Sequence, residues 1–155
     1  MTADFEKLAY EAALRSLDKQ ESLLDELRGR TNTLLAISSL AVSVLGREAF
    51  RNANSKAMAL AALTAFVVSV AGSVFVLLPK KKLTFAESGA GLYEGLYALR
   101  DDMPEVYRRL TYELSRRRTS NDLRIATLAG AYTVAAVASI LELLILAALM
   151  GSNIF

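Results

Sequence analysis

Three long apolar stretches alternate with charged segments along this chain of 155 residues. They run from Thr31 to Gly46, from Ala57 to Pro79 and from Ile125 to Met150, and the only acidic or basic residue in them is Glu142. A bilayer core about 30 Å thick requires about twenty helical residues, because backbone groups in lipid must pair within their own helix. The second and third stretches therefore predict membrane-spanning helices.

The first stretch, with about sixteen uncharged residues or about 24 Å of helix, is either a short span or a buried core helix. Arg28 and Arg30 extend its effective length, because their aliphatic stems can lie along apolar surface while their guanidinium groups reach the lipid headgroups. We therefore expect three spans, over residues 31–50, 57–79 and 125–150.

Composition agrees with a membrane protein. Hydrophobic residues make up 54% of the chain and charged residues 22%, and the charges fall almost wholly outside the three stretches, whereas a soluble domain would mix them along amphipathic elements. The length suits a single membrane domain over residues 1–155. The first thirty residues are charged and lack the pattern of a signal peptide, so the first span is expected to act as its own insertion signal.

The chain contains no cysteine and no histidine. Disulfides and cysteine-based zinc sites are therefore excluded, and so are the commonest general base and the commonest metal ligand. No glycine-rich phosphate loop or nucleophile elbow appears. We expect no cofactor, no metal and no enzymatic activity; an enzyme would have to use Glu, Asp, Lys or Tyr at a site that the sequence does not indicate.

The basic residues that flank the expected spans are unevenly distributed. One side would carry Arg28, Arg30, Lys80, Lys81, Lys82, Arg116, Arg117, Arg118 and Arg124, and the other Arg47, Arg51 and Lys56. The positive-inside rule then places the N-terminus and residues 80–124 in the cytoplasm and the C-terminus outside. We interpret the Lys and Arg triplets as topology signals that contact anionic lipid, with a dedicated anion site as the alternative.

Residues 1–30 predict a cytoplasmic amphipathic helix, rich in good helix formers and free of proline. Tyr10, Leu17 and Leu24 recur every seven residues, and Gln20 lies three residues after Leu17. This seam suits packing against a helix of a second copy or of the same chain, with Gln20 fixing the register. The alternative is an ordinary amphipathic helix that lies on its own domain.

Residues 80–124 predict a cytoplasmic helical hairpin. Pro79 ends the second span, and Ser88 is expected to cap the first hairpin helix. Asp102 is expected to cap the second, with Pro104 in its first turn and Glu105 three residues after the cap. The tyrosines of the hairpin suit packing better than base stacking, so no nucleic-acid partner is expected.

Small side chains recur at helix-packing intervals in the three stretches, where they would allow close approach of helices in lipid. They are Ser39 and Ser43 in the first, Ala61, Ala65, Ser69 and Ser73 in the second, and Ala131, Ala135 and Ser139 in the third.

Glu142 shares the face of Ser139, three residues earlier. An ionised carboxylate inside a bilayer is costly unless it is paired, hydrated or protonated. Two interpretations are open. Glu142 either has a structural partner, such as Lys56, Arg51 or a serine of another span, or it acts in gating or ion passage.

Several segments carry a family resemblance. They are Leu24-Asp25-Glu26-Leu27-Arg28 with Arg30-Thr31 and Leu34-Leu35, then Leu77-Leu78-Pro79, and Gly95-Leu96-Tyr97-Ala98-Leu99-Arg100-Asp101-Asp102. They resemble a group of small actinobacterial membrane proteins, and the layout of helix, two spans, cytoplasmic helices and last span is similar to Pycsar transmembrane effectors and more distantly to SLATT proteins. The resemblance implies antiphage signalling, in which a cyclic nucleotide or a partner triggers an effector that oligomerises and impairs the membrane.

The sequence thus predicts an all-α membrane bundle of three spans that forms homo-oligomers in the bacterial inner membrane. The expected function is to permeabilise or depolarise that membrane in antiphage defence, with lipid as a partner and a cyclic nucleotide or a cytoplasmic protein as the trigger. The alternative is a non-catalytic scaffold or anchor for a cytoplasmic partner. The candidate functional residues within the membrane are Ser39, Ser43, Ser139 and Glu142.

Overall fold

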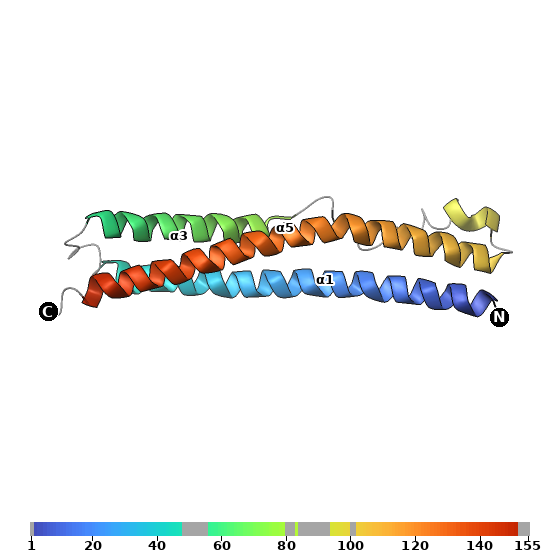
Figure 1. Cartoon of the computed structure of the whole chain (residues 1–155), viewed down its shortest axis with the longest axis horizontal. Helices are drawn as coiled ribbons and strands as arrows, with labels where there is room; N and C mark the ends of the chain where they lie inside the picture. Colours follow the sequence, from blue (N-terminus) through green and yellow to red (C-terminus); the bar gives the residue numbers. More distant parts are fainter. Residues whose placement is uncertain (1, 48–55, 80–82, 84–93, 100–101, 152–155) are drawn as a thin grey trace. The chain divides into compact units, whose positions relative to one another are not determined.

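The computed structural model describes residues 2–47, 56–79, 83, 94–99 and 102–151, and all regular structure among them is helical. The elements are helix α1 (Thr2–Ala41), the π-helical turn η1 (Val42–Gly46), helix α3 (Lys56–Leu77), the 3₁₀ turn η2 (Tyr97–Leu99) and helix α5 (Met103–Gly151). Figure 1 labels the three long helices. The all-α prediction is confirmed. Among the described residues, two helices, α3 and α5, are long and apolar enough to cross a membrane.

The chain forms two compact units. Unit 1 comprises Met1–Asp25 with Lys80–Ala126, and unit 2 comprises Glu26–Pro79 with Thr127–Phe155. Both α1 and α5 contribute to both units, because each is one continuous helix that changes from charged to apolar along its length. The second hairpin helix and the last apolar stretch are therefore a single helix of 49 residues. The expected cap at Ser88 lies outside the described residues.

Local chemistry explains where α3 ends and where α5 begins. The last turn of α3 closes with a 2.9 Å hydrogen bond from Leu78 N–H to the Val74 carbonyl, and Pro79, which follows, has no N–H to continue it. At the start of α5, the Glu105 N–H donates to the Asp102 carboxylate at 3.2 Å. The predicted proline stop and acidic cap are both confirmed.

Buried side chains recur every seven residues on the three long helices. They are Leu17, Leu24, Thr31 and Ser38 on α1, Ala62, Ser69 and Val76 on α3, and Asn121, Leu128, Ala135, Glu142 and Leu149 on α5. A seven-residue repeat keeps one narrow seam facing the neighbouring helices, as in left-handed coiled coils. Helix packing in each unit is therefore of the coiled-coil kind.

In unit 1, the first half of α1 runs parallel to the first half of α5. The amide of Gln20, which is 5% exposed, donates to the Arg118 carbonyl at 3.1 Å and to the Asp122 carboxylate at 2.5 Å. Nearer the helix starts, the rings of Tyr10 and Tyr107 lie 5.6 Å apart, centroid to centroid. The residues of the predicted seam are buried or half-buried within this unit: Tyr10, Leu17, Gln20 and Leu24.

In unit 2, the end of α1, α3 and the second half of α5 form a three-helix bundle (Figure 1). The Ser38 hydroxyl on α1 is hydrogen-bonded to the Ser139 hydroxyl on α5. Helix α3 runs antiparallel to α5, because Ala62 packs with Leu146, whereas Gly72, farther along α3, faces Ala135, earlier on α5. A Cβ atom added to Gly72 would lie 3.0 Å from the Ala135 Cβ, so these two helices approach closely.

Candidate functional site

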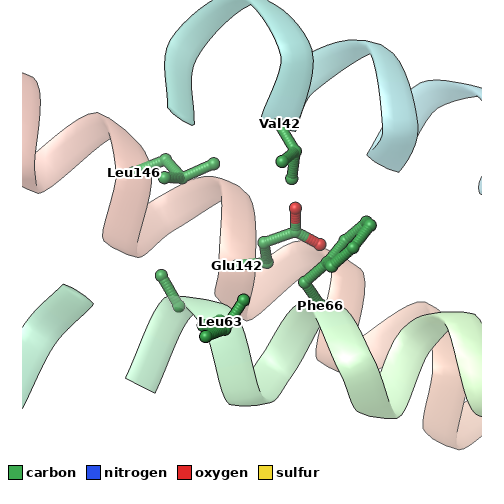
Figure 2. Close-up of a pocket in the computed structure, with 6 residues that line it drawn as sticks. Val42, Leu63, Phe66, Glu142 and Leu146 are labelled. Atoms are coloured by element: carbon green, nitrogen blue, oxygen red, sulfur yellow. The ribbon is translucent and has the colours of Figure 1, made fainter. Parts of the chain in front are cut away.

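Glu142 is the most unusual residue of the bundle in unit 2. Its exposed fraction is 0%, and neither of its carboxyl oxygens has a hydrogen-bond partner. The seven-residue seam of α5 turns this side chain into the core, and Figure 2 shows the carboxyl pointing into the space between Val42 and Phe66. Glu142 is therefore an acidic group in the position of a core residue.

The cavity at Glu142 is otherwise apolar. It is lined by Val42 of η1, by Leu63 and Phe66 of α3 and by Leu146 of α5, together with Ala62 (Figure 2). Its free volume is about 10 Å³, the lower limit for a single water molecule. An ionised carboxylate in such surroundings would cost several kcal/mol, so a charge here requires water or a counterion to enter.

Buried hydroxyl groups extend the polar character of the core along the bundle. Ser38 and Ser139 pair with each other, one turn before Glu142 on α5. On α3, Ser69 and Ser73 are 0% exposed, and their hydroxyl oxygens have no hydrogen-bond partner. We call these residues the polar seam: Ser38, Ser69, Ser73, Ser139 and Glu142.

The helix of α1 changes form beside the cavity. Its α-helical hydrogen bonding ends at Ala41, and the π-helical turn η1 begins at Val42, which lines the cavity. Single π-helical turns are rare in proteins, and those that occur often lie at functional sites. The sequence gives no signal for this turn, because Val42–Gly46 has no proline and reads as ordinary apolar helix.

The structure corrects the predicted polar face of the first span. Ser39 and Ser43 are exposed, and the Ser43 hydroxyl donates to the Ser39 carbonyl of its own helix at 2.8 Å. Ser38 occupies the packed face instead. Two residues four positions apart share a face wherever they lie on a helix, so the spacing of Ser39 and Ser43 does not identify the packed face. The seven-residue seam does, because it continues from Leu24 through Thr31 to Ser38.

None of the other predicted site residues in the described part of unit 2 contributes a charge to the cavity at Glu142. Lys56 is exposed and does not pair with its carboxyl, and Arg51 is outside the described residues. Lys80, Lys81 and Lys82 are likewise outside the described residues. In unit 1, Arg116 and Arg118 are exposed and Arg117 is half-buried.

Within the described ranges, no cluster of three or more His, Cys, Asp or Glu residues could hold a metal ion. Comparisons with protein-family models, curated proteins and solved structures find no match to the chain. The polar seam, which includes the buried acid Glu142, is the candidate functional site of the described residues.

Proposed function

We propose that this chain is a three-span protein of the bacterial inner membrane that assembles with copies of itself and permeabilises or depolarises that membrane in antiphage defence. The observation that carries the proposal is Glu142, a buried acid without a partner in the apolar bundle of unit 2. Acidic residues inside membrane bundles are costly and mark ion or proton pathways by default.

The bundle supports a third span beside α3 and α5. Ser38 of α1 pairs with Ser139 in the middle of the apolar part of α5. The two helices run parallel there, because Val42, four residues after Ser38, lines the cavity of Glu142, three residues after Ser139. Whatever depth Ser139 has in a bilayer, Ser38 shares it. Residues 31–46 of α1 would then cross the membrane together with α5, and α3 would return between them.

The polar seam favours a conducting role over a merely structural one. An apolar side chain in place of an unpaired buried acid generally stabilises a packed core, so structural packing alone gives no reason for Glu142. If the helices part and water enters, the carboxylate and the hydroxyl groups of Ser69 and Ser73 would line the water-filled path. In this proposal the packed bundle is the closed state.

Unit 1 is proposed to receive the trigger, a cyclic nucleotide or a cytoplasmic protein. Because α1 and α5 both run through it, a signal received there has a covalent route to unit 2. Unit 1 also exposes large apolar side chains, at Phe5, Leu8, Tyr112 and Leu123. The same exposed side chains support a second candidate function, a membrane scaffold that anchors a cytoplasmic partner.

The effector and the scaffold are distinguished by measuring membrane potential and dye entry in cells that express the wild type, Glu142→Gln or Glu142→Ala. An effector depolarises the cells in a way that changes with Glu142 but not with the control Glu113→Gln, an exposed acid of unit 1. If no form depolarises cells with any trigger, and native mass spectrometry finds only monomers, the effector is excluded and the scaffold remains.

A further inference from the structure

The cavity at Glu142 restricts what the carboxyl can bind. The residues that face it from η1 and α3 are Val42, Ala62, Leu63 and Phe66, and none of them is charged or titratable. The nearest charged residues along those elements, Arg47 and Lys56, are exposed. On α5, the described residues that follow Tyr132 are all uncharged except Glu142 itself. The carboxyl therefore has no protein counterion among the described residues.

A metal cation does not suit this cavity. Hard cations take about six or more oxygen ligands, or keep several waters of their own. The cavity offers the two oxygens of one carboxyl, apolar walls and room for at most one water molecule. A proton needs one oxygen and no additional ligand, and it removes the charge whose burial is costly.

We propose that Glu142 is a proton-binding site whose occupancy keeps the bundle of unit 2 closed. In the packed bundle the carboxyl is neutral. When the helices part and water reaches the cavity, the carboxylic O–H bond breaks, the proton passes to water, and a hydrated carboxylate remains. This inference rests on the proposed membrane location, and it names the step that controls the proposed permeation.

The pH dependence follows from proton linkage. The packed form holds one proton that the opened form releases, so the opened form binds fewer protons. Stability of the packed form therefore decreases as pH rises. Replacing Glu142 by Gln keeps the shape of the side chain and removes the proton, so the contribution of this residue to the pH dependence should disappear.

Infrared spectroscopy of the full chain in lipid nanodiscs tests the protonation state directly. The wild-type minus Glu142→Gln difference spectrum at neutral pH should contain the C=O band of a neutral carboxylic acid, shifted in D₂O. A carboxylate band at that pH would overturn the proposal. If Glu142→Gln does not fold, Glu142→Leu provides the reference, because leucine matches the apolar lining.

Thermal unfolding of the same samples gives an independent measurement. The melting temperature of the wild type should fall from pH 5 to pH 9 more steeply than that of Glu142→Gln, and equally in sodium, potassium and choline chloride at one ionic strength. Glu113→Gln should behave as the wild type. Equal slopes of melting temperature against pH for the wild type and Glu142→Gln, or stabilisation by one cation alone, would overturn the proton site.

Neither the infrared nor the thermal measurement depends on membrane leakage. A neutral Glu142 carboxyl in a protein that does not depolarise cells would therefore reject the proposed function and leave the proton site standing.

Discussion

The hydroxyl pair between Ser38 and Ser139 is a direct polar contact between α1 and α5 within the bundle. Either Ser38→Ala or Ser139→Ala should lower the free energy of unfolding, and a double-mutant cycle should give a coupling of about 0.6 kcal/mol, typical of such bonds between membrane helices. Ser39→Ala is the matched control, because the Ser39 side chain is exposed. Coupling between Ser39 and Ser139 of similar size would contradict the assignment of the packed face.

Gln20 is the corresponding polar residue of unit 1. Gln20→Ala should cost about 1 kcal/mol, because its amide donates both to the Arg118 carbonyl and to the Asp122 carboxylate. Gln20→Leu should restore stability, since leucine suits a coiled-coil seam, but should weaken the preference for one helix register. The free energies of unfolding of the wild type and the variants are measured by denaturation in detergent, monitored by circular dichroism. Glu21→Ala, an exposed neighbour, is expected to have no effect.

The first turn of α5 should become less stable at acidic pH. Hydrogen bonds from Arg109 and then from Arg108 lower the pKa of Glu105. A carboxyl whose pKa is lowered by folding stabilises the fold above its unfolded pKa, and that contribution is lost as pH falls through the folded value. Backbone amide exchange in residues 105–109 should therefore speed up, relative to the intrinsic rate, on acidification. An unchanged acid response in Glu105→Gln would exclude this cause.

Between helices, the contact of α3 with α5 is expected to depend on glycine at one position. A Cβ on Gly72 would lie 3.0 Å from the Ala135 Cβ and 3.2 Å from the Ala131 carbonyl oxygen, so Gly72→Leu should force the helices apart and destabilise unit 2 by about 1–3 kcal/mol. Gly130→Ala is the control, because nothing lies within 4 Å of its added Cβ. Its better helix propensity should leave stability unchanged or raised. Equal losses in both variants would refute the close contact.

The parts of this fold that depend on local chemistry could be predicted from the sequence. Pro79 and Asp102 act on their own helix ends, so α3 and α5 end and begin where expected. The sequence left the course of α1 at Gly29 open, because a glycine between charged and apolar residues marks either a bend or only a weak point in one long helix. The structure shows one continuous helix. The choice of Ser38 over Ser39 depends on where a second helix lies, which residue spacing alone does not determine.

The burial of Glu142 was predictable from its spacing, but its lack of a partner was not. The sequence offered Lys56, reaching down from the expected outer loop, and serines of other spans as partners. The structure leaves Lys56 exposed and fills the space around the carboxyl with Val42 and Phe66. Packing around a buried group is a property of three helices together, and no single segment encodes it.

For the whole molecule, the number of spans determines where the chain ends lie. With α3 and α5 as the only spans, both termini face the same compartment, whereas a third span over residues 31–46 separates them. Because Ser38 pairs with Ser139 in the apolar part of α5, we expect three spans, with the N-terminus cytoplasmic. Paired reporter fusions, active only outside or only inside the cell, should report opposite compartments for residues 1 and 155.

The substitutions Ile37→Arg or Leu40→Arg, at exposed positions of the expected span, should impair this topology. The substitution Leu8→Arg, at an exposed position of unit 1, should not. Termini in one compartment would instead mean that residues 31–46 do not accompany α5 across the membrane.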